Sequence, residues 1–204
     1  MNKGTLRTHL IALLNRSDCT TALADTFIDQ AMARITRTIR IPSMEKQQTY
    51  TISSATGTGA IQIPVDFLES IDLYSNGVPL VRIPVQEMVE YQKSGELGQP
   101  TFFCRVQASY LLHPQPTGGT VTLDYYGEFT ALANDAATNQ LTTVGSDALI
   151  YTALGYAADY FLDERGANFD AKAGQLLSEI QNQADASELS GGTQAMRPTG
   201  HFQD

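Results

Sequence analysis

The sequence contains few of the residues that stabilise disulfide-rich or zinc-binding proteins. It has two cysteines, Cys19 and Cys104, with no CxxC pair, and its three histidines, His9, His113 and His201, are scattered. Disulfide frameworks and structural zinc sites need such residues in groups at short spacing. We therefore expect two buried free thiols, no metal and no cofactor.

Long apolar runs and catalytic motifs are also missing. No apolar run approaches the roughly 20 residues that a membrane span needs, and the N-terminal apolar segment is too short and too interrupted for a signal peptide. There is no nucleophile elbow, P-loop or HExxH motif, and GTGAIQ lacks the third glycine of a dinucleotide-binding loop. We expect a protein that is made in the cytoplasm, does not cross a membrane and is not an enzyme.

Positive charge is scarce and unevenly distributed. The net charge is −9, but residues 1–46 hold seven Lys or Arg against four Asp or Glu, whereas the remainder holds six against eighteen. An acidic body repels phosphate, which disfavours equilibrium binding to nucleic acid without sequence preference. Contact with DNA that slides past remains compatible with this charge.

Two helices are predicted in residues 1–44. The first covers residues 5–15, with four leucines on one face. The second covers residues 21–40 and has an apolar residue every fourth position, at Leu23, Phe27, Ala31, Ile35 and Ile39. Pro42 ends it. Arginines in its last turns suit the negative end of the helix dipole, with partner binding as the alternative.

Residues 45–128 change to the alternating pattern of strands. We expect six or seven strands: a hairpin that turns through Gly57 and Gly59, a second hairpin with a type I′ turn at Asn76 and Gly77, and the segments TFFCRV, SYLLHP and GTVTLDYYGEF. After Pro84, a short helix is predicted with an inward face, which Val85, Met88 and Val89 form. The aromatic pairs in TFFCRV and LDYYG could stack on bases, but core packing and subunit contacts explain them better because Arg105 is the one cation nearby.

Residues 145–165 predict a helix that is apolar on nearly all sides. Its one polar edge consists of Thr152, Gly155, Asp159 and Asp163. Such a helix needs cover on several sides, either from its own chain or from neighbouring copies. We expect both, and name Leu149, Tyr156, Tyr160 and Phe161 as candidate subunit contacts. A further helix is predicted over residues 168–188, with Gly166 as the joint.

The fold class that follows is α+β: a helical bundle of about four helices, split in sequence, with an inserted small antiparallel β module and a flexible C-terminal extension. The boundaries are 1–44 and 129–188 for the bundle, 45–128 for the β module and 189–204 for the extension. Met196, Arg197, His201 and Phe202 are candidate docking residues in that extension. An end without any contact is the alternative.

Two acidic pairs are the nearest approach to catalytic groups. Asp159 with Asp163, or Asp163 with Glu164, could serve glycoside hydrolysis if burial separated their pKa values. A solvated edge of an amphipathic helix is the simpler explanation.

Several segments together resemble the head-to-tail adaptor (connector) proteins of tailed bacteriophages, from about Ile63 onward. They are IPVDFLESIDLYSNGVPL, VQEMVEYQKSGELGQPTFFCRV, LLHPQP followed by VTLDYYGEFTALANDAATNQLTT, and SDALIYTALGYAADYFLDERGANFDAKAGQLLSEI. Their order and spacing carry the resemblance.

The resemblance implies a virion protein at the head-tail junction. It would form a ring, usually of twelve copies, that binds the portal protein through its C-terminal extension and presents a platform to tail or nozzle proteins. DNA would pass through the channel without sequence-specific binding. Two alternatives stay open: a virion-associated peptidoglycan hydrolase, and a tail-completion or tail-tube ring protein.

Overall fold

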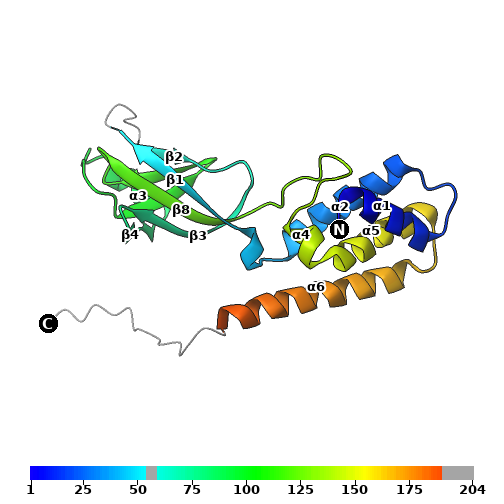
Figure 1. Cartoon of the computed structure of the whole chain (residues 1–204). Coiled ribbons are helices and arrows are strands. Elements are labelled where there is room, and N and C mark those ends of the chain that lie inside the picture. Colours follow the sequence, from blue (N-terminus) through cyan, green and yellow to red (C-terminus); the bar gives the residue numbers. More distant parts are fainter. Residues whose placement is uncertain (54–58, 190–204) are drawn as a thin grey trace. The chain divides into compact units, whose positions relative to one another are not determined.

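The computed structural model describes residues 1–53 and 59–189, and the chain divides into two units. A helical unit combines Met1–Ser43 with the chain from Phe129 onward, and a β unit comprises Met44–Glu128. Figure 1 shows helices from both ends of the chain in the first unit and all strands in the second. The α+β class, with a β module inserted into a split bundle, is therefore confirmed. The predicted extension lies outside the described residues.

The helical unit contains four longer helices and one short one. They are α1 (Lys3–Leu14), α2 (Thr21–Thr38), α4 (Gln140–Val144), α5 (Ser146–Phe161) and α6 (Gly166–Leu189). Polar side chains start three of them: those of Asn2, Thr20 and Asn139 each accept a backbone N–H three residues later. The sequence predicted the longer four. It missed α4, because five residues are too few to show a helical period.

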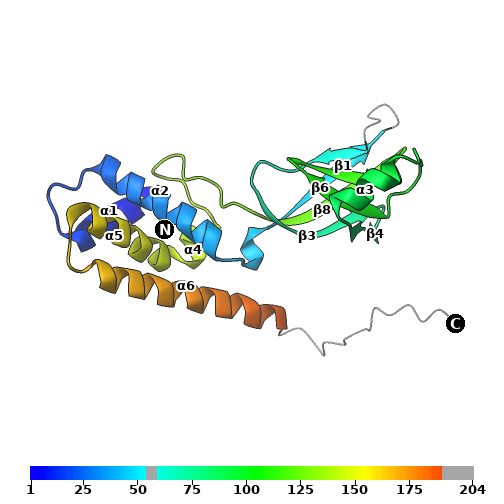
Figure 2. The same cartoon turned by 180° about the vertical axis from the view of Figure 1, so that it is seen from behind.

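Helix α5 is the centre of this unit, and its own chain covers it. It contacts α1, α2, α4 and α6, and α6 runs beside the other helices in both views (Figures 1 and 2). The buried residues of α5 are Ala148, Leu149, Ile150, Thr152, Ala153, Leu154, Gly155, Ala157 and Ala158.

The prediction of a polar, solvent-exposed edge on α5 is wrong for Thr152 and Gly155. Thr152 is fully buried and donates its hydroxyl to the carbonyl of Ala148 at 2.7 Å. Gly155 faces α6 so closely that a Cβ atom there would lie 3.0 Å from Oδ1 of Asp170. The absent side chain at Gly155 thus marks close helix packing rather than contact with water.

The β unit consists of two four-stranded sheets. One has the order β1 (Glu45–Ile52), β8 (Gly119–Gly127), β3 (Phe67–Ser75), β4 (Val78–Pro79), and the other the order β2 (Ala60–Gln62), β7 (Ser109–His113), β6 (Phe102–Val106), β5 (Val81–Arg82). Among the strands of the described residues, β5 and β6 form the one parallel pair. In β1 and β8, Glu45 lies opposite Tyr126, so the two chain segments that connect the units leave from the same end of one strand pair.

The expected first hairpin is wrong. β1 pairs with β8 and β2 pairs with β7, so the two predicted arms belong to different sheets. Alternation of side chains predicts that a segment is a strand, but it does not say which strand is its partner. Both arms still meet in one core, because Tyr50 from β1 and Ile61 from β2 pack in the same cluster.

That core lies between the two sheets and draws on both. Its buried residues are Ile61, Leu73, Leu80, Phe103, Tyr110, Leu112, Val121, Leu123 and Tyr125. Helix α3 (Val85–Gln92) covers the outer side of the second sheet, where Met88 packs with Ile83 and Cys104. The predicted inward positions of Val85 and Val89 are wrong, since both are exposed.

The predicted type I′ turn is confirmed. Asn76 and Gly77 have φ values of 49° and 81°, and they join β3 to β4. The Asn76 carboxamide also accepts the N–H of Thr120 at 2.9 Å, which fixes this turn to the start of β8. Gly119, with φ of 94°, lies directly beneath that carboxamide.

We predict that Gly119→Ala destabilises the β unit by about 2 kcal/mol or more, because positive φ is strained and because the new Cβ would lie 2.6 Å from Oδ1 of Asn76. Gly95→Ala is the matched control, since its φ is 64° but nothing lies within 4 Å. Gly95→Ala introduces the backbone strain without a steric clash, so it should lower the free energy of unfolding by about 1 kcal/mol. Urea unfolding measures both, and equal losses would contradict the role of the Asn76 contact.

Candidate interaction surface

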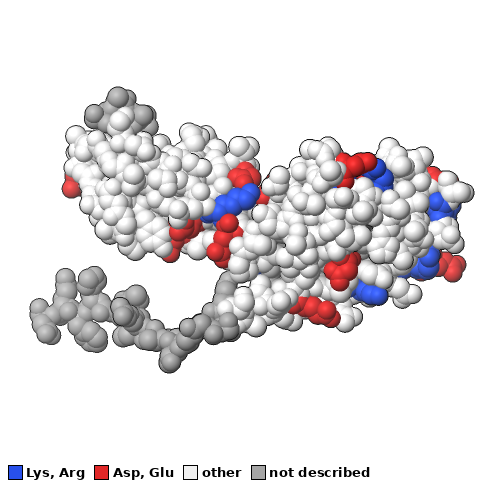
Figure 3. All heavy atoms as spheres, viewed as in Figure 1, with Lys and Arg blue, Asp and Glu red and all other residues white. Residues whose placement is uncertain are grey.

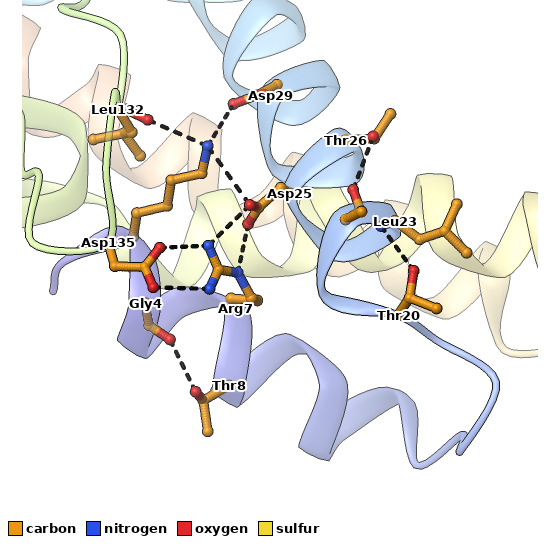
Figure 4. Close-up of polar contacts among 12 residues, drawn as sticks. Gly4, Arg7, Thr8, Thr20, Leu23, Asp25, Thr26, Asp29, Leu132 and Asp135 are labelled. Carbon is orange, nitrogen blue, oxygen red and sulfur yellow. Dashed lines mark hydrogen bonds and ion pairs between the residues drawn. The ribbon is translucent and has the colours of Figure 1, made fainter.

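An ion-pair cluster ties the start of the bundle together (Figure 4). Arg7 of α1 donates two hydrogen bonds to Asp25 of α2, at 2.6 and 2.9 Å, and two to Asp135 of the loop before α4, at 3.1 and 2.6 Å. Nζ of Lys3 lies 3.7 Å from Asp29 and 4.0 Å from Asp25. These bonds raise the pKa of Arg7 and lower the pKa of Asp135. The cluster joins α1, α2 and the loop before α4, and its carboxylates neutralise Lys3 and Arg7.

A second group of side chains, which we call the bundle tip, lies where α1 and α5 end: Arg16, Tyr160, Phe161 and Leu162. The rings of Tyr160 and Phe161 lie 4.8 Å apart at nearly right angles, and both contact Phe27 of α2. The Arg16 guanidinium lies 4.6 Å from the centre of the Phe161 ring. Tyr160 is 59% exposed and Leu162 is 91% exposed.

Leu162 combines two unfavourable features. It ends α5 in the left-handed conformation, with φ of 53° and ψ of 44°, a position where glycine is the common residue. A leucine there costs about 1–2 kcal/mol in backbone strain. Its side chain also projects into solvent, and no described contact compensates either cost. The strained backbone and the exposed side chain make Leu162 a candidate contact residue.

Asp163 and Arg165 connect the bundle tip to the end of α1 through hydrogen bonds. The Arg165 guanidinium donates to both oxygens of Asp163, at 2.6 to 3.1 Å, and to the carbonyl of Leu14 at 2.9 Å. A cation at this place satisfies carbonyls that the last helical turn leaves free. The hydrogen bonds from Arg165 lower the pKa of Asp163 to about 2.

The acidic pairs do not have the properties of a glycosidase site. Asp163 is held ionised by Arg165 and so cannot act as a general acid near neutral pH. Asp159 and Glu164 are exposed, whereas the acid of such a site lies in an apolar pocket. In the described part of the chain, no group of three or more His, Cys, Asp or Glu could hold a metal ion.

The two cysteines are buried free thiols, as predicted. Neither is in a disulfide, and burial raises the pKa of both Cys19 and Cys104. A raised thiol pKa disfavours the reactive thiolate.

The four candidate subunit contacts differ in their exposure. Leu149 has no exposed surface, so the structure does not support its place at an interface. Tyr156 is half-buried and lies under the guanidinium of Arg34. Phe161 is half-buried and Tyr160 is exposed, and these two lie together at the bundle tip. The candidate docking residues Met196, Arg197, His201 and Phe202 lie outside the described residues.

A family model described as SU10 adaptor protein matches residues 1–198. The chain belongs to the SU10 adaptor protein family. A comparison with curated proteins gave no match. Membership makes this SU10 adaptor a structural protein of a bacteriophage virion, which associates with other head or tail proteins. None of the described helices combines the length and the apolar character that a membrane crossing requires.

The sequence reasoning missed Leu162 and Arg16 at the tip. It assigned the end of α5 to Gly166, whereas the left-handed residue is Leu162, four positions earlier. The available signal was the polar run that begins at Asp163, directly after the last apolar residue of the helix. That run marks where the period ends, although it does not show that a leucine adopts the glycine conformation.

We predict that the acid sensitivity of the adaptor depends partly on Asp163. Its folded-state pKa of about 2 lies below the ordinary value of 3.8, so its stabilising contribution is full above pH 4 and is lost as pH falls toward 2. Asp163→Asn should therefore lower the urea midpoint above pH 4, and the difference from wild type should close near pH 2. Glu164→Gln removes a neighbouring charge without that pairing and should follow wild type. A constant difference from pH 6 to 2 would refute the assignment.

Proposed function

We propose that this SU10 adaptor forms a ring of about twelve copies that binds the portal of a DNA-filled capsid, joins it to the tail and leaves a channel for DNA. The family match over residues 1–198 is the observation that carries the proposal. The ring, its copy number and its portal attachment follow from the resemblance to head-to-tail adaptors. A ring forms when one surface of each copy meets a different surface of the next.

The bundle tip supplies one such surface in this proposal. Tyr160 and Leu162 expose apolar side chains there, and Leu162 adopts a left-handed backbone conformation. A neighbouring copy that covers them would recover the free energy of burying two large apolar groups, about 1.5–3 kcal/mol each. The core of the unit is complete without this contact, since α5 is covered within its own chain.

The charge distribution suits a channel that must release DNA. Several cations of the helical unit are paired with carboxylates: Arg7 with Asp25 and Asp135, Arg16 with Asp18, Arg34 with Asp170, and Arg165 with Asp163. On the face drawn in Figure 3, charged atoms form small groups within a largely uncharged surface. Twelve copies at −9 each would gather on the order of a hundred negative charges, which oppose tight binding of the phosphate backbone.

The tip contact can be tested with Leu162→Gly. Because glycine adopts the left-handed conformation without strain, the free energy of unfolding should stay the same or rise by up to about 1 kcal/mol. The number of rings seen by electron microscopy with purified portal of the same phage should nevertheless fall. Val65→Ala removes apolar surface from an equally exposed position of the β unit and should leave assembly unchanged. Normal rings from the glycine variant would show that the tip is not the contact.

Portal attachment can be tested by ending the chain at Leu189. The truncated protein should keep the circular dichroism of the full chain, because the described core contains no residue beyond that point. It should lose binding to purified portal, and Phe202→Ser in the full chain should weaken that binding. Unchanged affinity of the truncated protein would disprove docking through residues 190–204. Binding of the full chain to a tail protein but not to portal would instead indicate a tail-completion ring.

A further inference from the structure

A groove on the helical unit has room for a peptide. Its first part is an apolar cavity of about 190 Å³ beside the last turns of α6, and it is open to solvent. The lining residues are Ile41, Pro42, Ser43, Val144, Ile180, Gln183, Ala184 and Ser187. Val144 is 54% exposed here, although it is a large apolar residue.

A second cavity of about 410 Å³ continues the groove. It shares Ser43 and Val144 with the first, and hydroxyl and amide side chains line the rest: Thr130, Thr138, Asn139, Gln140 and Thr143. The groove is therefore apolar along α6 and polar around the start of α4. None of the described residues that line either part is ionisable, on a chain whose net charge is −9.

Ser43 lies where the two parts of the groove meet. Its Oγ is buried and has no hydrogen-bond partner among the described residues, and a buried polar atom without a partner costs about 1–3 kcal/mol. Ile180, which lines the apolar part, packs closely on the start of α5, since a Cβ atom at Gly145 would lie 2.7 Å from its Cδ1. That packing fixes the side of the groove that α6 forms, and the other side is open to solvent.

The chain supplies a segment of suitable length at the right place. Fifteen residues follow Leu189, and Ser187 already lines the groove. Gly191 and Gly192 permit the positive φ values that reverse a chain after a helix. The groove wall from Ser187 to Ile180 spans about 10 Å at 1.5 Å per helical residue. Four extended residues, 193–196, cover about 13 Å.

We infer that residues 190–204 of the same chain bind this groove when no other protein holds them. Met196 enters the apolar part beside Ile180, and the mostly polar segment that follows lies along the hydroxyls and amides near α4. The apolar residue of the segment thus meets the apolar part of the groove, and the polar residues that follow meet its polar part. A segment tethered at the rim has a high effective concentration, which favours it over the same segment from another copy.

This inference goes beyond the proposed function and does not depend on it. If the portal also binds residues 190–204, it must compete with the groove, so the free protein would hold its docking segment back until a portal displaces it. The groove interaction is measured without portal, so its failure would leave the portal proposal untouched.

The test uses methyl NMR of the full chain with labelled Ile and Val. In Met196→Ser, the signals of Ile41, Val144 and Ile180 should shift, and those of Ile61 and Ile71 in the β unit should not. Gln194→Ser, a change of similar size two residues away, should leave all of them in place. The chain that ends at Leu189 should shift the three groove signals in the same direction as Met196→Ser.

Two results would overturn the inference. The first is coincidence of the three groove signals in wild type, Met196→Ser and the truncated chain, which would mean that the segment does not occupy the groove. The second is movement of the wild-type groove signals toward those of the truncated chain on dilution, because only binding between copies depends on protein concentration. Wild-type signals that are constant over a hundredfold dilution, together with the Met196→Ser shift, support the inference.

Discussion

Burial of α5 on nearly every side is the constraint on which the helical unit depends. Four other helices surround it, two from the beginning of the chain and two from the end. A helix with buried residues on so many faces cannot be stable in water alone, because its apolar surface needs cover from several directions. Helices α1 and α2 therefore have to pack on α5, although an insertion of 85 residues, Met44–Glu128, separates them from it in the sequence. The β unit can be inserted because it has a separate core between its own two sheets.

Much of this fold could be predicted because it depends on periodic patterns. The change from a period near four to a period of two marks the unit boundary near Ser43, and the Asn76-Gly77 turn has a strong local signal. The pairing of β1 with β8 could not be predicted in this way, because it joins segments some 75 residues apart and no local pattern identifies the partner. Gly155 was misread for a related reason: a missing side chain looks polar in a pattern, whereas here it allows α6 to approach closely.

The candidate surface could be predicted only in part. Tyr160 and Phe161 were named from their apolar character, and they do lie together at one end of the bundle. Leu149 was named for the same reason, but it is fully buried. The apolar pattern of a central helix does not show which of its residues its own chain covers and which stay exposed. The cluster around Arg7 was not foreseen, because its members come from three segments that only the folded chain brings together.

The pairing of Glu45 with Tyr126 has a mechanical consequence. Both covalent links between the units start at the same end of one strand pair, so they run as two adjacent tethers rather than one. Tension applied to the β unit is shared between the tethers, and a protease that cuts one of them leaves the halves connected through the other. Such a nick would therefore leave the β unit attached to the rest of the chain.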